Sequence, residues 1–293
     1  MKIALLDLGS NTIKMAAYQL DGGSFQQIYY HATFAYVIGF VENNRLSDEG
    51  VGKIIETIRY YKKAAALLGC DRMDCFSTAS LRFIDNRSEV IDEVERQTHL
   101  RIQAISGEQE AYYNFLSMKL IAGEDSFVGG DLGGGSLQLF ACQNGQLAGE
   151  RSFPLGALKL YKQFVRGDFP TKAEAEALCA FVRETLEASG FYTDFTNETL
   201  YFMGGTVRMI AGILDKKTGN FTKSDLDALT ERFLNDWDYA RAEIMRTVPE
   251  RLHTILPGML VIGTACAYLG RTRICYTQNS VREGYLLDHY LQS

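Results

Sequence analysis

The order of apolar and polar residues predicts three consecutive strands at the start of the chain. Apolar runs at 3–8, 13–20 and 25–38 are separated by the short polar turns GSN and DGG. A helical apolar periodicity then begins after Ser47, a good N-cap residue, and ends before Gly69, where a C-terminal glycine is expected. Strands and helices alternate from there, so the first half of the chain is predicted to be βββαβαβα.

The second half repeats this order. Apolar runs at 126–131, 136–142 and 146–153 predict three further strands, and an Asn-Gly dipeptide joins the last two, as is typical of a tight hairpin. Helices and strands alternate again up to a closing helix at 281–291. One mixed α/β unit written twice predicts a duplicated domain.

Each copy opens with the same turn. The first strand of each copy ends in Asp-Leu-Gly, once at Asp7 and once at Asp131, and small or polar residues follow. Glycine permits a tight turn and a close approach of backbone N–H groups to an anion, and an aspartate at the strand end can hold Mg²⁺. Neither turn matches a GxGxxG or a P-loop pattern. Two such hairpins are expected to grip a phosphate chain, whereas either one alone could be an ordinary hairpin.

Composition narrows the class of protein. The 293 residues are 46% hydrophobic and 23% charged, and no segment approaches a membrane span or a secretory signal. A net charge of −6 argues against general nucleic-acid binding but permits a phosphate ligand in a local pocket. The six cysteines form no CxxC pair, which favours reduced thiols in a cytoplasmic protein. The four histidines show no metal-ligand spacing.

Several motifs follow one another in an order that resembles the exopolyphosphatase / guanosine pentaphosphate phosphohydrolase family, in its short two-domain form. They are DLGSNT, STASLRFIDN, ISGEQEA, DLGGGS, PLGALKL, MGGTVRM and VREGYLL. The resemblance covers residues 3–287 and implies two actin-like (ribonuclease H-like) α/β domains with a cleft between them. Domain I would comprise 1–121 plus 281–293, and domain II would comprise 122–280.

The resemblance implies hydrolysis of a terminal phosphoanhydride of polyphosphate or guanosine pentaphosphate, with Mg²⁺ as cofactor. Glu110 would orient and deprotonate the attacking water, and Arg82 would hold phosphate oxygens. Asp7 and Asp131 would bind the metal, and all four side chains are expected to converge in the cleft. The residues expected to bind phosphate are Gly9, Ser10, Asn11, Thr12, Lys14, Arg82, Gly133, Gly134, Gly135, Ser136, Gly205 and Thr206.

Some roles stay open at this point. Glu108 and Glu110 could be acids at the start of a helix, because Ser106 and Gln109 form a capping-box pattern there. Lys159 is a further phosphate-binding candidate of the same standing as Lys14, and Arg208 could equally be a surface residue.

One position departs from the family pattern, since Gln138 stands where the family carries a glutamate. A neutral amide is expected to weaken Mg²⁺ binding. Two other functions therefore remain as alternatives: a polyphosphate or nucleotide sensor without turnover, and a small-molecule kinase of the same superfamily. The chain-length preference and the oligomeric state, with a homodimer among the alternatives, are not fixed by the sequence.

Overall fold

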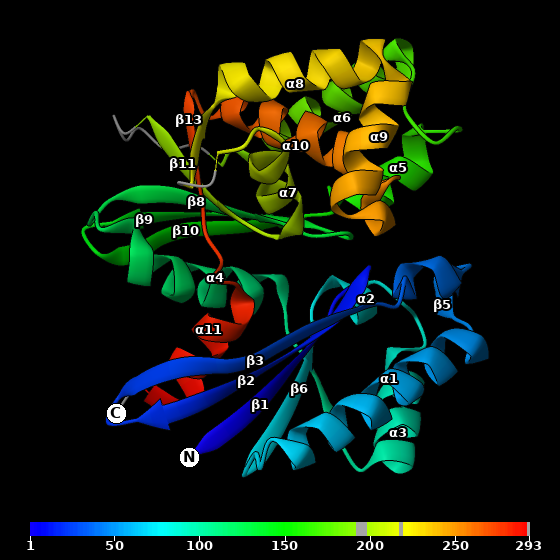
Figure 1. Ribbon diagram of the computed structural model, residues 1–293, viewed down its shortest axis with the longest axis vertical. Coiled ribbons are helices and arrows are strands. Elements are labelled where there is room, and N and C mark those ends of the chain that lie inside the picture. Colours follow the sequence, from blue (N-terminus) through cyan, green and yellow to red (C-terminus); the bar gives the residue numbers. More distant parts are fainter. Residues whose placement is uncertain (192–197, 217–218, 292–293) are drawn as a thin grey trace. The chain divides into compact units, whose positions relative to one another are not determined.

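A computed structural model describes residues 1–191, 198–216 and 219–291 of the chain (Figure 1). The described chain forms two compact units, each with its own mixed sheet. The units comprise Met1–Glu110 with Leu286–Ser293, and Ala111–Tyr285. The division falls within the helix α4 (Gly107–Ala122), whereas the domain limits expected from the sequence stay a prediction.

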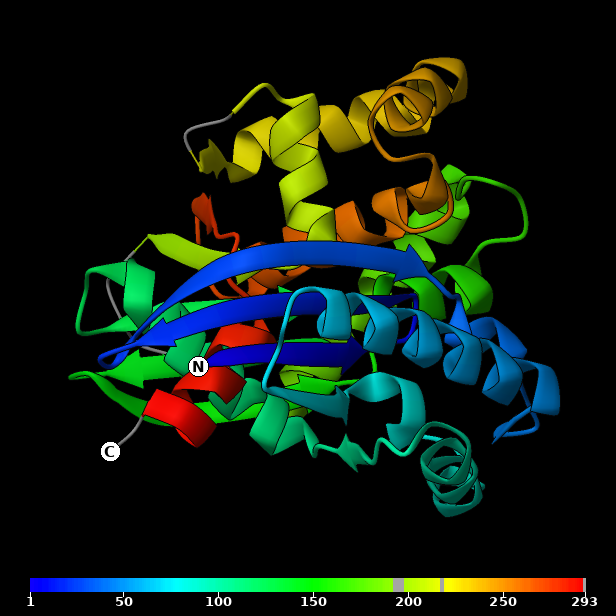
Figure 2. The same ribbon diagram turned by 60° about the horizontal axis from the view of Figure 1, so that its bottom comes forward.

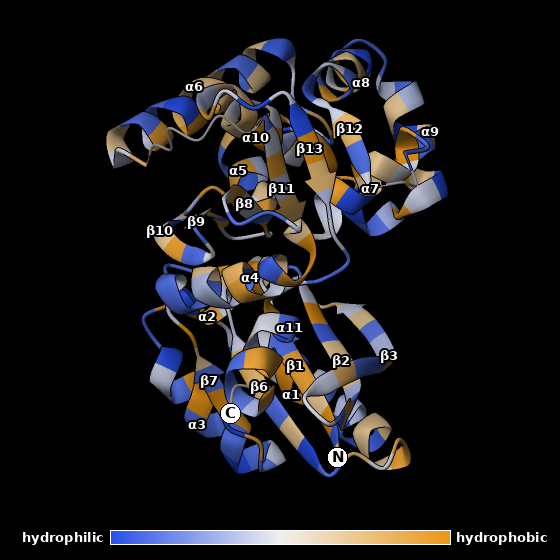
Figure 3. Ribbon diagram, turned by 90° about the vertical axis from the view of Figure 1, so that its left-hand side faces the viewer, coloured by the Kyte–Doolittle hydropathy of each residue, from blue (hydrophilic) through white to orange (hydrophobic). Residues whose placement is uncertain are grey.

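The sheet of the first unit has the strand order β3-β2-β1-β6-β7. Its strands are β1 (Lys2–Leu8), β2 (Thr12–Asp21), β3 (Ser24–Phe34), β6 (Arg72–Ser77) and β7 (Ile102–Ala104). The hairpins β1–β2 and β2–β3 are antiparallel, and β1, β6 and β7 are parallel. The carboxyl ends of these three parallel strands therefore lie at one edge of the sheet. The edge strand β3 is mostly exposed and mixes polar with apolar residues (Figure 3).

Two long helices cover one face of this sheet (Figures 1 and 2). They are α1 (Asp48–Leu67) and α3 (Arg87–Thr98), and the short α2 (Ala79–Arg82) follows β6. Helix α1 begins as predicted, because Ser47 Oγ accepts a hydrogen bond from the Gly50 N–H. Its residues Ile54, Ile58 and Tyr61 are fully buried against the strands.

The third predicted strand is shorter than expected. It was predicted to reach residue 38, but β3 ends at Phe34. Tyr36 adopts a left-handed conformation with φ of 47°, and the chain then turns into the 3₁₀ helix η1 (Val37–Phe40). A short hairpin, β4 (Val41–Glu42) and β5 (Arg45–Leu46), leads into α1.

The sheet of the second unit has the order β10-β9-β8-β11-β13-β12, which repeats the first sheet and adds β12 at its edge. Its strands are β8 (Phe127–Leu132), β9 (Leu137–Gln143), β10 (Gln146–Phe153), β11 (Thr199–Met203), β12 (Asn220–Thr222) and β13 (Arg273–Tyr276). The pairs β8–β9 and β9–β10 are antiparallel, and β8, β11 and β13 are parallel, as in the first unit. The prediction of a duplicated α/β fold is confirmed.

Helices pack on both faces of the second sheet. Neighbouring strand residues point to opposite faces, so Phe127 packs against Met118 of α4, whereas Val128 belongs to the core shared with α6 and α10. The helices that follow α4 are α5 (Ala157–Phe164), α6 (Lys172–Ser189), α7 (Gly205–Ile213), α8 (Lys223–Asn235), α9 (Trp237–Thr247), η2 (Pro249–Arg251), α10 (Ile255–Tyr268) and α11 (Val281–Leu286). The closing helix continues as a π-helical segment, η3 (Leu287–Leu291). In the described part of the chain, no helix has the length and apolar character needed to cross a membrane.

Candidate functional site

The two Asp-Leu-Gly turns have the same backbone geometry. In the first hairpin, the Gly9 N–H donates to the Thr12 carbonyl at 3.1 Å. In the second hairpin, the Gly133 N–H donates to the Ser136 carbonyl at 3.0 Å. The repeated sequence pattern therefore forms the same closed turn twice, at the carboxyl end of the first strand of each sheet.

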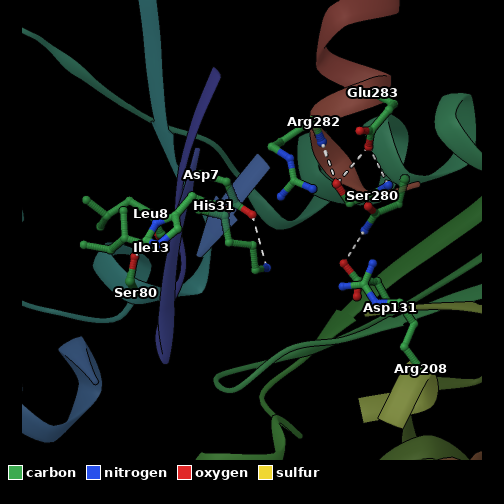
Figure 4. Close-up of polar contacts among 12 residues, drawn as sticks. Asp7, Leu8, Ile13, His31, Ser80, Asp131, Arg208, Ser280, Arg282 and Glu283 are labelled. Atoms are coloured by element: carbon green, nitrogen blue, oxygen red, sulfur yellow. Dashed lines mark hydrogen bonds and ion pairs between the residues drawn. The ribbon is translucent and has the colours of Figure 1, made fainter. Parts of the chain in front are cut away.

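The residue opposite each aspartate differs between the copies. Asp7 pairs in register with Lys14, whose Nζ lies 3.4 Å from Asp7 Oδ2 (Figure 4). Asp131 pairs in register with Gln138, which is buried and donates from Nε2 to the Oγ atoms of Ser136 at 2.8 Å and Ser152 at 3.3 Å. The first copy thus places a cation beside its aspartate, and the second places a neutral amide.

The first turn is held by its carbonyl groups. The Asn11 carbonyl accepts from the N–H groups of Ala35 and Tyr36, and the Ser10 carbonyl accepts from that of Ile38. Ser10 Oγ and Asn11 Oδ1 are buried, and no described residue forms a hydrogen bond with either atom. A buried polar atom without a partner costs about 1–3 kcal/mol, so two such atoms in one turn point to a ligand.

The second turn is held by α5. The first N–H groups of this helix, those of Ala157, Leu158 and Lys159, donate to the carbonyls of Gly133 and Gly134 at 3.0 Å. Among the described residues, no acceptor takes the N–H groups of residues 134–136. Backbone N–H groups grouped in a glycine turn form a concavity that suits an anion.

Gly156, the glycine of the PLGALKL motif, lies against the backbone of the second turn. A Cβ atom at Gly156 would lie 2.2 Å from the carbonyl carbon of Gly135 and 2.3 Å from the nitrogen of Ser136. Only glycine fits here, and the close contact presses the start of α5 onto the turn. No role for Gly156 was predicted from the sequence.

Arg82 and Glu110 form a buried ion pair in the first unit. Arg82 ends α2, which follows β6, and Glu110 lies in the first turn of α4, which follows β7. Arg82 Nη2 donates to Glu110 Oε2 at 2.5 Å, and the two side chains are 13% and 7% exposed. Ser80 Oγ donates to the Leu8 carbonyl at 2.5 Å, which fixes α2 beside the end of β1. Asp7 thus lies at the carboxyl end of β1, and Arg82 and Glu110 follow the neighbouring parallel strands β6 and β7. This is the edge where α/β sheets bind ligands.

The neighbouring Glu108 behaves as an ordinary acid at a helix start. The Ser106–Gln109 capping box is confirmed, since each residue's N–H donates to the side chain of the other. Glu108 is exposed, and a hydrogen bond from its own backbone N–H, followed by one from Ser106, lowers the pKa of its carboxyl. Glu110 differs from it in burial and in its arginine partner.

The MGGTVRM motif lies at the corresponding edge of the second sheet. Helix α7 begins at Gly205, and Gly204 has a φ of 108°, which favours glycine. A Cβ at Gly204 would lie 2.9 Å from Asp131 Oδ1, and a Cβ at Gly205 would lie 1.9 Å from Arg251 Nη2. The Arg251 guanidinium therefore covers the start of α7. Arg251 could not be predicted as a site residue, because no local sequence pattern marks it. Arg208 donates to the Gln278 carbonyl at 3.2 Å.

The VREGYLL motif attaches α11 to α4 within the second unit. Glu283 Oε2 accepts from the Ser280 N–H at 2.7 Å and from Ser280 Oγ at 2.9 Å, which caps α11 (Figure 4). A Cβ at Gly284 would lie 1.7 Å from the Tyr113 carbonyl oxygen. The two helices are therefore in backbone contact, and glycine is required at this point.

The oxygen donors suit a hard cation more than a transition metal. Among the described residues, no three His, Cys, Asp or Glu side chains gather as a metal site. Mg²⁺ is usually held by one or two carboxylates together with waters and substrate phosphates, which a single aspartate in a hairpin can support. Asp131 Oδ2 also accepts from Asn114 Nδ2 at 3.4 Å. The expected convergence of Asp7, Arg82, Glu110 and Asp131 involves residues of both units and stays a prediction.

Comparison with known proteins connects this geometry to one family. A family model described as the Ppx/GppA phosphatase family matches residues 36–293. Exopolyphosphatase 1 of Mycobacterium tuberculosis is 25% identical over 307 residues, which cover 98% of this chain and 88% of the relative. The crystal structure of an Aquifex aeolicus Ppx/GppA family member matches with a TM-score of 0.82 at 21% identity, over 99% of this chain and 98% of the other. An exopolyphosphatase structure from Cytophaga hutchinsonii matches with a TM-score of 0.87 at 15% identity, over 98% and 97%.

Proposed function

The chain belongs to the Ppx/GppA phosphatase family and is a hydrolase, and we propose that it removes the terminal phosphate of inorganic polyphosphate or guanosine pentaphosphate with the help of Mg²⁺. The name of the mycobacterial relatives supports polyphosphate, and the GppA part of the family description supports the guanosine substrate. Both substrates end in a phosphoanhydride, so one set of phosphate contacts could serve both.

The observation that carries this proposal is the buried Arg82–Glu110 pair. The arginine fixes the position of the carboxylate, and a positioned carboxylate can accept a proton from a water molecule. Glu110 would orient a water and take its proton as the water oxygen bonds to the terminal phosphorus. The bond from that phosphorus to the bridging oxygen breaks, and orthophosphate leaves. Arg82 would hold oxygens of the phosphoryl group while charge develops on them.

The two glycine turns would bind the phosphate chain. The N–H groups of residues 134–136 and the side-chain oxygens of Ser10 and Asn11 have no partner among the described residues. The N–H groups are suited to phosphate oxygens, and the side-chain oxygens are suited to a hydrated cation. Lys14 would add a positive charge. Asp7 and Asp131 would hold Mg²⁺, which neutralises phosphate charge when bound.

The test is a phosphate-release assay on long-chain polyphosphate, tripolyphosphate and guanosine pentaphosphate, each with Mg²⁺ and with chelator. We expect Mg²⁺-dependent release of orthophosphate from at least one substrate. A second candidate function is a polyphosphate or nucleotide sensor without turnover. Gln138 favours it, because a neutral amide adds no negative charge beside Asp131 to attract a cation. Tight binding of polyphosphate with no release from any substrate would support the sensor and contradict hydrolysis.

A further inference from the structure

Asn114 lies in the second unit with a buried amide that is satisfied on one side only. It belongs to α4 and is 0% exposed. Its Nδ2 donates to Asp131 Oδ2 at 3.4 Å, and no described residue donates to its Oδ1. The amide nitrogen therefore faces Asp131, the metal-binding candidate of this unit, and the amide oxygen has no donor among the described residues.

Apolar residues lie beside Asn114 on α4. The next residue, Phe115, and Met118 one turn later are buried in an apolar cluster with the strands of the second sheet. An unpaired buried carbonyl costs about 1–3 kcal/mol relative to a paired one, and a leucine, whose side chain has the same heavy-atom branching, would avoid that cost. A cost of this size needs an explanation, and a cation bound to Asn114 Oδ1 would supply one.

We propose that Asn114 is a ligand of the divalent cation in the second unit, its carbonyl oxygen binding the ion together with the carboxylate of Asp131. This inference rests on the proposed Mg²⁺-dependent function. Carboxylate and amide oxygens are the ligands that hard cations prefer. An amide can turn about its last side-chain bond, so Asn114 presents its N–H to Asp131 without the ion and its oxygen to the ion when it is bound.

The arrangement also accounts for Gln138. The family pattern places a glutamate there, but in this chain the Gln138 nitrogen is committed to the hydroxyls of Ser136 and Ser152. A ligand from α4 supplies an oxygen from a different element. The two proposed protein ligands, Asn114 and Asp131, both belong to the second unit.

The test measures ion binding without substrate, by calorimetry with Mg²⁺ and by electron paramagnetic resonance with Mn²⁺. Asn114→Leu should weaken both affinities roughly tenfold, at the lower end of the effect of ligand and supporting residues. Asn114→Asp should tighten them, because a second carboxylate faces the ion, and should lower the melting temperature in chelator more than in Mg²⁺. Ser117→Ala is the matched control. It removes another buried, unpartnered polar atom one turn later on α4 and should leave both affinities unchanged.

The alternative is a structural amide. In that case Asn114→Leu lowers the melting temperature in chelator and leaves ion affinity unchanged, and Asn114→Asp does not tighten binding. That result, or no measurable ion binding by the unsubstituted chain, overturns the inference. Phosphate release is scored separately. Mg²⁺-dependent release with unaltered ion affinity in the Asn114 variants refutes the role of Asn114 alone, and altered affinity without release from any substrate refutes hydrolysis alone.

Discussion

Gln138 stands directly opposite Asp131 in the β8–β9 ladder, so the two side chains leave the same face of the sheet. The equivalent pair in the first unit is Asp7 with Lys14. The duplicated hairpins therefore share a backbone but differ in charge, and the second is the one whose aspartate lacks a cation opposite it in the ladder.

Placing a carboxylate at residue 138 should strengthen Mg²⁺ binding. A glutamate at 138 can accept hydrogen bonds from the Ser136 and Ser152 hydroxyls, which rotate to donate, so Gln138→Glu should keep the packing. A second negative charge beside Asp131 should lower the Mg²⁺ concentration needed for half-maximal phosphate release. Mg²⁺ titrations of the two proteins that superimpose would remove Gln138 from the metal site.

The contact between α5 and the second turn should be sensitive to a single methyl group. Gly156→Ala would force the turn at Gly135 and Ser136 to shift, with a loss of stability of about 1–3 kcal/mol and a marked loss of turnover. The measurements are denaturant unfolding and phosphate release. Gly212→Ala is the control, since Gly212 is exposed in α7 with open space around its Cβ position, and it should gain up to about 1 kcal/mol. Equal stability and turnover in both variants would show that the turn does not depend on this packing.

The guanidinium over the start of α7 should contribute to substrate binding. Because the N-terminus of a helix attracts anions, Arg251 at Gly205 is placed to meet a phosphate there. Arg251→Ala should raise the KM for guanosine pentaphosphate or polyphosphate about tenfold, in line with a lost hydrogen bond to a charged group. Arg246→Ala is the control, because Arg246 is an exposed residue of α9 that pairs with Glu243. A KM that rises equally in both variants would indicate a general effect of charge.

The features that the sequence predicted well are local ones. The Ser47 cap of α1, the Ser106–Gln109 box and the Asn144-Gly145 turn depend on neighbouring residues only, and each forms as expected. The repeated order of strands and helices, with the Asp-Leu-Gly turn in each copy, predicted the duplication, and the two sheets share the same strand order apart from the added β12.

The features that were missed depend on contacts between distant segments. Helix α9 was not predicted, and the residues that it buries are Ala240 and Ile244. Arg251 becomes significant only when Gly205, far away in the sequence, is found beneath it. Asn114 could have been noticed as a polar residue between apolar ones in α4, but its partner Asp131 could not.

A single substitution tests whether Glu110 is the general base. Glu110→Gln keeps the shape of the side chain and an acceptor oxygen for Arg82 but removes the ability to take a proton. If Glu110 takes the proton from water, its loss should lower the rate of phosphate release at least ~10²-fold under single-turnover conditions with saturating Mg²⁺. Glu108→Gln, on the same turn but exposed, should remain within about twofold of the unsubstituted protein. Near wild-type release by Glu110→Gln, or equal losses in the two variants, would show that Glu110 is not the general base.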